Sequence, residues 1–431
     1  MHNTIQNYDW GSRWMFPVLQ TAEGFDGSEG APEAPIAELW MGTHPRGPSS
    51  VEISPGRRVP LTEILSRSNG GELPFLFKVL TAERGLSIQT HPSRDLAQEG
   101  FRREDARGVD IEAPHRMYRD RNHKPELLCA IHEFWGLRGF RPLPELQREM
   151  RGFLSAFPAT PPTKVHDAVS RFVATPSEAT WREAFATLLQ AAENAEHPSV
   201  QRALLDYCGD PTRDDRVQER DNRYWWCREL MRQFPGDLGA AAPLYLNVVH
   251  LHPGEAMYLE AGVLHAYLYG AGVELMAASD NVLRAGCTSK HVDRQELLRA
   301  LAFVFQPAAI VRPPSLPCGT GFMRRFVTTA GEFELLQCGV PNGLQAGRVH
   351  LTKTRGSAAV VLSVGADARI FDERPDGSGS SREQGNTVVL ASMESAVVDY
   401  GTDRFEVEVT PPGVVYVAGE PGAIRCSEDD Q

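Results

Sequence analysis

The sequence predicts a mainly β protein with two β-domains of the barrel or sandwich type, the first of them interrupted by an α-helical insertion. Short apolar runs separated by turn residues recur on both sides of the insertion and again from residue 316 onward. The 431-residue length is too great for one compact core. We therefore expect three units: 1–141 plus 241–315, the insertion 142–240, and 316–431.

The insertion is predicted from helix signals. Thr175-Pro176-Ser177-Glu178 is a capping box with proline at the first helical position, and apolar residues follow at helical spacing. In the C-terminal unit, runs such as 358–364 and 405–409 suggest strands, and the Gly/Ser-rich stretch 372–386 suggests a hairpin tip. This unit has no cluster of catalytic residue types, so we expect a structural role for it.

Composition excludes several classes of protein. The net charge of -12 argues against a nucleic-acid-binding surface, and no apolar run is long enough to span a membrane. The N-terminus is polar, so no signal peptide is expected. Seven scattered cysteines without a CxxC pair suit a reducing cytoplasm and exclude the usual cysteine zinc sites.

The stretch 245–290 carries the densest group of functional residue types. His265 begins a predicted short strand that Gly270 closes, and a set of carboxylates and cations follows in otherwise apolar sequence: Glu274, Asp280, Arg284 and Lys290. The run 74–80 is typical of a strand buried on both faces, so Lys78 within it must reach an edge or pair inside a site. The charged segment 94–122 is interpreted as an irregular loop at a site mouth.

Candidate metal ligands come from three separate places. Gln89 and His91 lie two residues apart on a predicted strand, so both side chains face one side. Glu126 begins an apolar strand, where an unpaired carboxylate would be costly; Lys124 is its ordinary partner and a cation the alternative. With His265 the set suits zinc, although iron or manganese would accept it.

A rival ligand set remains open on spacing alone. His250 and His252 have the same one-face spacing and could join His265 with Glu255 or Glu260. That set would resemble the two-histidine, one-carboxylate site of a non-haem iron oxygenase.

Arg284 and Lys290 suggest phosphate binding. Apolar residues surround the arginine, and no acidic run nearby needs neutralising. An arginine fork and a lysine point charge are a usual pairing for a sugar phosphate, and Ser87 could add a hydroxyl donor.

Several motifs together resemble a known family. NTIQNYDWGS, FLFKVL…LSIQTHP, NHKPELL and HAYL…GVELMAASDNVLRAG occur in order over the first 300 or so residues. In this combination they are similar to type I mannose-6-phosphate isomerases, zinc enzymes of the cupin superfamily. The chain departs from the family at Cys287-Thr-Ser289-Lys290, where a proline usually precedes the lysine.

The resemblance implies two cupin-type β-barrel or jelly-roll domains with a helical insertion. It implies that one Zn²⁺ per chain is bound by Gln89, His91, Glu126 and His265, that Arg284 is an active-site residue, and that Lys124, Glu274 and Lys290 line the sugar-phosphate pocket. It places His250 and His252 outside the ligand set.

The implied reaction interconverts mannose 6-phosphate and fructose 6-phosphate through a cis-enediol, within carbohydrate metabolism and GDP-mannose biosynthesis. Glu274 is the expected proton shuttle and Lys124 a competing base. We expect a cytoplasmic monomer or weak homo-oligomer. An iron cupin oxygenase and a non-catalytic sugar-binding cupin stay as alternatives.

Overall fold

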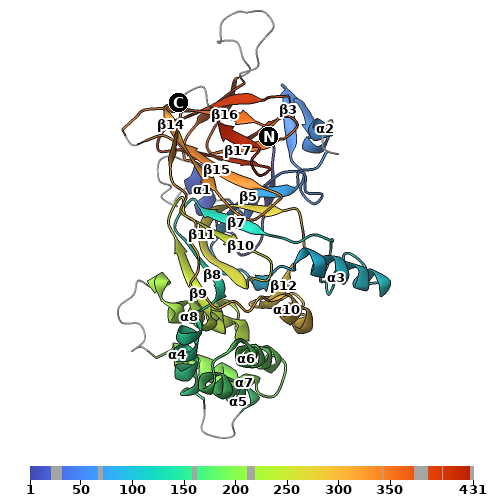
Figure 1. The fold of residues 1–431 in the computed structure, drawn as a ribbon, viewed down its shortest axis with the longest axis vertical. Coiled ribbons are helices and arrows are strands. Elements are labelled where there is room, and N and C mark those ends of the chain that lie inside the picture. Colours follow the sequence, from blue (N-terminus) through green and yellow to red (C-terminus); the bar gives the residue numbers. More distant parts are fainter. Residues whose placement is uncertain are drawn as a thin grey trace, which may run out of the picture.

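The computed structural model has three parts arranged along its long axis (Figure 1). The C-terminal strands form one end, with the N-terminus beside them, the large sheet from the first part of the chain forms the middle, and a block of helices forms the other end. The structure describes residues 1–20, 32–66, 71–157, 163–210, 219–341, 343–372, 387–399 and 401–427. Most of the predicted hairpin tip, 373–386, lies outside the described residues.

The middle part is built on one long strand, β11 (His265–Ala277). The sequence suggested a short strand closed by Gly270, but β11 continues past that glycine. Its first half pairs with β6 (Ile88–Thr90) and β8 (Phe134–Phe140), and its second half pairs with β5 (Phe75–Ala82) and β7 (Glu126–Ala130). The remaining strands of this sheet are β1 (Thr4–Gln6), β2 (Glu38–Met41), β9 (Leu246–Leu251), β10 (Ala256–Leu259) and β12 (Leu283–Gly286).

Gly270 makes this double use of β11 possible. Its φ of +125° is unfavourable for residues with a side chain, and a Cβ there would lie 2.3 Å from the Glu133 carbonyl oxygen. The backbone therefore passes from one set of partner strands to the other only with glycine at this position.

Two predictions about neighbouring segments have opposite outcomes. All eight residues of β5 are buried, as the apolar run predicts. The segment 94–122 does not form an irregular loop throughout, because it opens with helix α3 (Arg94–Ala106), whose N-cap Ser93 accepts a hydrogen bond from the Leu96 amide. This helix projects from the body of the molecule in Figure 1, and most of its charged side chains are exposed. Because it has many charged residues, the sequence showed no clear helical spacing of apolar residues.

The helical block follows β8 along the chain. A helix does begin here, but its capping box is shifted by two residues from the predicted one: the N-cap is Ser177, whose side chain accepts from the Thr180 amide, and the Thr180 hydroxyl accepts from the Ser177 amide. Its aromatic face packs against the underside of the middle strands in one continuous core. Its helices are α4 (Leu143–Leu154), α5 (Lys164–Ala174), α6 (Glu178–Ala191), α7 (His197–Cys208), η2 (Glu219–Asp221), α8 (Arg223–Gln233), η3 (Leu238–Ala241) and α9 (Ala242–Tyr245).

The C-terminal part is a sandwich of two antiparallel sheets with an apolar core between them. One sheet holds β13 (Leu316–Cys318), β14 (Gly321–Phe326), β15 (Glu334–Gly339), β17 (Ala359–Val364), β20 (Ser395–Val398) and β22 (Val414–Gly419). The other holds β16 (Gly347–Lys353), β18 (Ala368–Asp372), β19 (Thr387–Leu390), β21 (Arg404–Val409) and β23 (Ile424–Cys426).

Two cysteines of this sandwich form a disulfide that the sequence analysis did not anticipate. Cys318 at the end of β13 is bonded to Cys426 at the end of β23, with their Cα atoms 5.8 Å apart. The five other cysteines are reduced and buried.

The prediction of a mainly β protein is confirmed, but closed barrels are not seen. The strand pairings of the described residues leave the first and last strands of each large sheet unjoined. A second core joins N-terminal residues such as Met15 to Phe326 and Tyr416 of the sandwich, so apolar packing crosses the predicted unit boundaries. The division into units stays a prediction.

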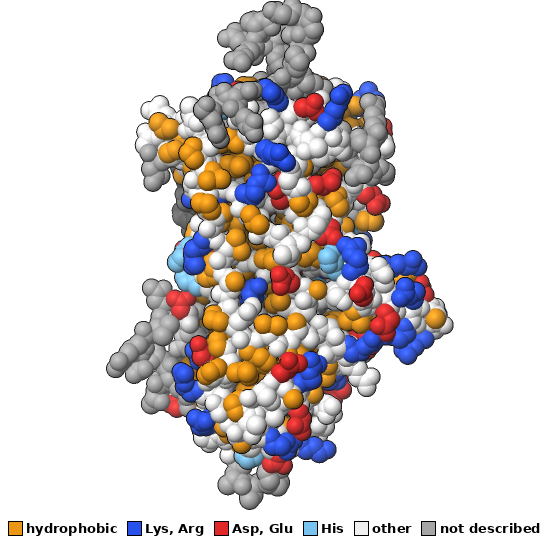
Figure 2. Space-filling model, viewed as in Figure 1, with side chains coloured by type: hydrophobic (Ala, Val, Ile, Leu, Met, Phe, Trp, Pro, Cys, Tyr) orange, Lys and Arg blue, Asp and Glu red, His pale blue; other side chains and the backbone are white. Residues whose placement is uncertain are grey.

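Two further features concern the surface. In the described part of the chain, no helix is both long and apolar enough to cross a bilayer. On the face shown in Figure 2, lysine and arginine side chains are interspersed with aspartate and glutamate and form no single basic surface. The remaining elements are α1 (Met15–Gln20), α2 (Leu61–Leu65), α10 (Arg294–Ala300) and the hairpin of β3 (Ser50–Ser54) and β4 (Arg57–Pro60).

Candidate metal centre and adjoining cavity

Three predicted ligands converge in the middle part of the chain. His91 follows β6, Glu126 begins β7 and His265 begins β11. Glu126 Oε1 lies 3.2 Å from His91 Nε2, and Glu126 Oε2 lies 3.4 Å from His265 Nε2. The three side chains are almost wholly buried, at 0%, 2% and 1% relative exposure.

The facing ring nitrogens of this triad have no hydrogen-bond partner. His91 Nε2, His265 Nε2 and Glu126 Oε2 are buried polar atoms without one, although they meet each other at ion-pair distance. Buried polar atoms are normally satisfied, so three unsatisfied atoms pointing at one spot indicate a missing partner. A cation would satisfy all of them together.

The opposite ring nitrogens fix the tautomers. His91 Nδ1 lies 2.7 Å from the Asn281 carbonyl oxygen, and His265 Nδ1 lies 2.9 Å from the Val263 carbonyl oxygen. A carbonyl can only accept, so each Nδ1 donates its hydrogen. In the neutral ring this leaves the Nε2 lone pair directed at the centre of the triad, as a metal ligand requires.

The electrostatics of the centre agree with this assignment. Burial lowers the pKa of His91 to about 4, so its imidazole is neutral near pH 7. Burial also acts to raise the pKa of Glu126, but its contacts with the His91 and His265 rings and the positive charge of Lys124 outweigh burial and hold that pKa well below its usual range. The triad therefore offers the neutral imidazole of His91 and a carboxylate, with the His265 ring beside them.

Gln89 is placed beside this triad by strand register. It pairs with His265 of β11 on one side and with Arg284 of β12 on the other. Directly paired residues project to the same face of a sheet, so all three side chains share one face. The Gln89 amide oxygen also accepts a hydrogen bond from the Ser87 hydroxyl at 3.1 Å.

A cavity of about 750 Å³ adjoins the centre. Gln89 and Lys124 line it, and Lys124 Nζ lies 3.1 Å from Glu126 Oε1, so these two residues join the cavity to the triad. Ser87, Arg284 and Lys290 line it as well.

The cavity wall carries cations without acidic partners. None of the described carboxylates lies within ion-pair distance of Arg284 or Lys290. The positive charge of Arg119 acts on both of them. Burial and the adjacent arginines lower the pKa of Lys290, and burial and Arg119 lower the pKa of Arg284. Crowding of like charges in half-buried surroundings is unfavourable unless an anion binds among them.

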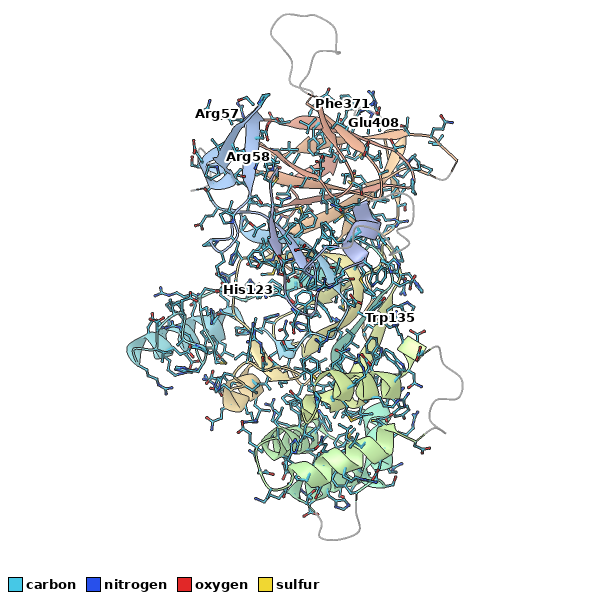
Figure 3. The ribbon with its side chains drawn as sticks, turned by 180° about the vertical axis from the view of Figure 1, so that it is seen from behind. Arg57, Arg58, His123, Trp135, Phe371 and Glu408 are labelled. Atoms are coloured by element: carbon cyan, nitrogen blue, oxygen red, sulfur yellow. A yellow bond between two sulfur atoms is a disulfide. The ribbon has the colours of Figure 1, made fainter. Side chains whose placement is uncertain are left out.

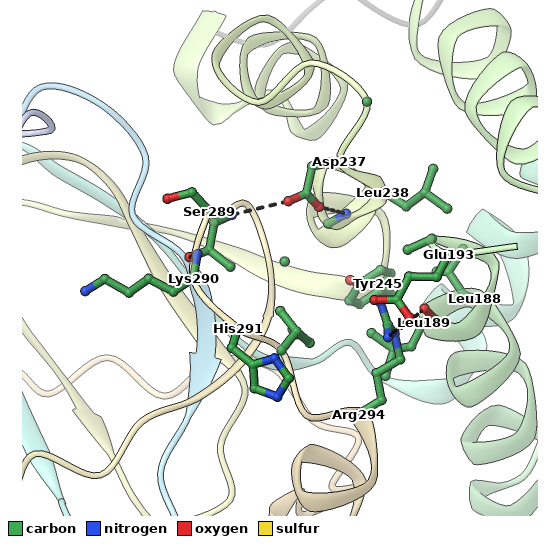
Figure 4. A pocket seen from close by; sticks show the side chains of 17 residues that line it. Leu188, Leu189, Glu193, Asp237, Leu238, Tyr245, Ser289, Lys290, His291 and Arg294 are labelled. Atoms are coloured by element: carbon green, nitrogen blue, oxygen red, sulfur yellow. Dashed lines mark hydrogen bonds and ion pairs between the residues drawn. The ribbon is translucent and has the colours of Figure 1, made fainter. Parts of the chain in front are cut away.

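The loop carrying Lys290 separates two cavities. A second cavity of about 460 Å³ lies between this loop and the helical block, as Figure 4 shows for Ser289, His291 and Asp237. Asp237 accepts hydrogen bonds from the amides of Gly239 and Thr288 and thereby ties η3 to the loop. These bonds hold the loop against the helical block.

Glu274 was expected to line the pocket with Lys124 and Lys290, but it is buried and is not among the residues that line the cavity beside the triad. Its carboxylate is 3.2 Å from Lys78 Nζ and accepts a hydrogen bond from the Tyr267 hydroxyl at 2.7 Å. Lys78 is also 3.3 Å from Glu38. The sequence left open whether Lys78 reaches an edge or pairs with other groups inside, and the structure shows that it pairs inside. Burial raises the pKa of Glu274, with Lys78 opposing that effect.

Some cavity residues were not singled out by sequence reasoning. They come from loops distant in the chain, and the NYDWG motif was the only signal among them. The principal ones are Tyr8, Trp10, Arg46, Arg84 and Arg119.

The rival ligand set does not assemble. His265 belongs with His91 and Glu126, whereas His250 and His252 gather around Glu133. The sequence spacing of the histidines could not separate the two sets. In the structure, β11 carries His265 to the buried face of the sheet, whereas His250 and His252 lie near the surface.

Comparison with known proteins gives consistent matches. Residues 1–143 match the model of the phosphomannose isomerase type I catalytic domain. The chain is 34% identical over 419 residues to the mannose-6-phosphate isomerase of Escherichia coli (strain K12), covering 93% of this chain and 97% of that protein. It is 34% identical over 371 residues to mannose-6-phosphate isomerase 2 of Arabidopsis thaliana, covering 79% and 78%.

Solved structures agree along nearly the whole length. A point variant of phosphomannose isomerase from Salmonella typhimurium superposes with a TM-score of 0.79 at 30% identity, covering 97% of this chain and 98% of that chain. A zinc-bound mannose 6-phosphate isomerase superposes with a TM-score of 0.78 at 30% identity and the same coverage.

Proposed function

The chain belongs to the mannose-6-phosphate isomerase family, and on that premise we propose that it interconverts mannose 6-phosphate and fructose 6-phosphate through a cis-enediol. The observation that carries the proposal is the buried triad His91, Glu126 and His265 beside a cavity whose wall bears Arg284 and Lys290. We also propose that it acts in carbohydrate metabolism, including GDP-mannose biosynthesis, as a cytoplasmic monomer or weak homo-oligomer.

The donor set fits zinc. Two imidazole nitrogens and a carboxylate oxygen are buried without hydrogen-bond partners, and Gln89 supplies an amide oxygen on the same face. These are ligands that zinc accepts. We assign His91, Glu126, His265 and Gln89 as the residues that would hold it. When bound, the ion supplies Lewis acidity toward substrate oxygens, worth several kcal/mol where negative charge develops.

Arg284 and Lys290 would bind the substrate's charge. A phosphate among these cations relieves their mutual repulsion and anchors the sugar at one end. Anchoring the remote phosphate orients the reacting carbons at the other end. Because Arg284 pairs with Gln89 across the sheet, its guanidinium could alternatively stabilise the enediolate. Ser87 adds a hydroxyl to the same wall.

Two residues are proposed for proton transfer between carbon 1 and carbon 2. Lys124 lines the cavity and is held by Glu126. Glu274 is fully buried with a raised pKa, so it can hold a proton closer to neutrality than an exposed carboxyl does. In a cis-enediol both transfers occur on one face, so a single group can remove and return the proton.

The decisive assay measures formation of fructose 6-phosphate from mannose 6-phosphate by a coupled reaction, before and after treatment with a chelator. Turnover that disappears with the chelator and returns with Zn²⁺ is expected. An iron oxygenase would instead consume oxygen, and a sugar-binding module would bind the substrate without turnover. Either result in place of isomerisation would contradict the proposal.

A further inference from the structure

A second group of metal-ligating side chains lies outside the site described above. Glu133 immediately precedes β8, while His250 is in β9 and His252 follows it. The antiparallel register places Trp135 opposite His250 and Phe134 opposite Leu251, so the three ligand side chains meet at one end of this strand pair. Trp135 in Figure 3 marks the place, where the middle strands meet the helical block.

The ligand atoms of this group are close together. One oxygen or nitrogen from each of Glu133, His250 and His252 can be chosen so that all lie within 4.8 Å of one another. His252 Nδ1 lies 3.0 Å from Glu133 Oε2, and His250 Nε2 is in hydrogen-bond contact with the same oxygen. The two imidazole rings have centroids 4.6 Å apart.

A third element fixes the orientation of His250. Its Nδ1 lies 3.0 Å from Asp221 Oδ1 at the end of η2, and the same carboxylate oxygen accepts a hydrogen bond from Trp135 Nε1 at 2.8 Å. The His250 ring also stacks on Trp135, with centroids 4.2 Å apart and planes 18° apart. A carboxylate that accepts from one ring nitrogen, while the other faces the ligand position, is the usual outer shell of a metal-bound histidine.

Carboxylate oxygens lie at both ring nitrogens of His250, so the negative charge on its Nε2 side favours a cation there. A divalent ion at that position would be within reach of Glu133 and His252 as well. The charged or titratable groups around this ligand cluster are Glu133, Asp221, His252, Arg220, Glu255 and Arg312.

We propose that His250, His252 and Glu133 form a second, peripheral site for a divalent transition-metal ion of the zinc class. Two imidazoles and a carboxylate suit such an ion, and calcium or magnesium would require more oxygen ligands. His252 is largely exposed, so water can complete the coordination. Through Asp221 the site joins the helical block to the edge of the sheet, and ion binding stabilises that junction.

The test uses the full-length protein loaded with one equivalent of zinc. Calorimetric titration with ZnCl₂ is expected to show one further equivalent bound with release of a proton, and a higher thermal midpoint. His250→Gln and His252→Gln should each abolish the second equivalent while the first is retained. Asp221→Asn, which removes only the outer shell, should weaken binding about 10- to 100-fold.

The control is His2→Gln. His2 also faces a carboxylate, Glu52, at 3.1 Å on the surface, but among the described residues no third metal-ligating side chain joins them, so this variant should bind the second equivalent as the parent does. Circular dichroism in the presence of chelator verifies that each variant is folded. The proposal is overturned if the parent binds only one equivalent, or if the doubly substituted His250→Gln, His252→Gln protein still binds two.

Discussion

His91 Nε2 and Glu126 Oε1 lie 3.2 Å apart in the interior, yet that nitrogen makes no hydrogen bond. The ring hydrogen is on the other nitrogen, where it is donated to the Asn281 carbonyl. A neutral imidazole thus points its lone pair at a buried carboxylate. This contact is unfavourable alone, and a cation between the two groups makes it favourable.

Removal of zinc should therefore destabilise the protein. An ion held by the triad binds only the folded chain, so saturation at about 100 times Kd adds ~2.7 kcal/mol to the free energy of unfolding. The thermal midpoint of chelator-treated protein, with and without added Zn²⁺, measures this. Using the His252→Gln background excludes the peripheral site. Equal midpoints would show that the triad binds no ion.

Replacement of Arg284 should affect catalysis and leave metal content unchanged. Arg284→Ala removes a guanidinium donor from the cavity wall, and kcat/KM for mannose 6-phosphate is expected to fall by about 10²- to 10³-fold. Arg284→Lys restores charge without the planar fork and should recover only part of the loss. A loss that comes only from a higher KM would assign the residue to phosphate binding, and a loss that comes only from a lower kcat would assign it to the enediolate. Parental kinetics for both variants would remove Arg284 from the site.

Glu274→Gln tests proton transfer directly. The amide keeps the side chain's size but cannot exchange a proton, so deuterium incorporation at carbon 2 in heavy water should stop while bound zinc is retained. The matched control is Glu38→Gln, because Glu38 contacts the same Lys78 amine at 3.3 Å against 3.2 Å for Glu274. Exchange that persists in Glu274→Gln leaves Lys124 as the base.

Lys290 should set an alkaline limit on substrate binding. Burial and the neighbouring Arg284 and Arg119 lower its pKa below the ordinary 10.5, so it loses its charge at lower pH than an exposed lysine. The KM for mannose 6-phosphate is then expected to rise as pH increases through that lowered pKa. Lys290→Arg keeps the charge and should flatten this rise. The same alkaline rise in both proteins would mean that another group titrates.

Gly270→Ala should destabilise the middle sheet. The new Cβ would lie 2.3 Å from the Glu133 carbonyl oxygen at a φ of +125°, so the backbone must shift, at a cost of about 3 kcal/mol. Gly331→Ala is the control, because a Cβ there meets nothing within 4 Å. Thermal unfolding compares the two. Equal midpoints would show that the bend of β11 tolerates a side chain.

The sequence was informative where local chemistry is strong. The fully apolar run around Lys78 forms a buried strand, and the capping box at Ser177 begins a helix. It was misleading at α3, whose polar faces hide the helical period, and at Gly270, where a turn signal marks a bend within one strand. Closed barrels were expected, but pairing between distant strands leaves the sheets open.

By itself the sequence determined the residue types of the candidate site, since amide, carboxylate, imidazole and cation are properties of single residues and their short-range spacing. Which histidines belong together was decided only by tertiary structure. The reason is strand register: β11 places His265 beside Gln89 on the buried face, whereas β9 and β8 bring His250 to Glu133 near the surface. Such pairings join segments more than a hundred residues apart, and local patterns carry no information about them.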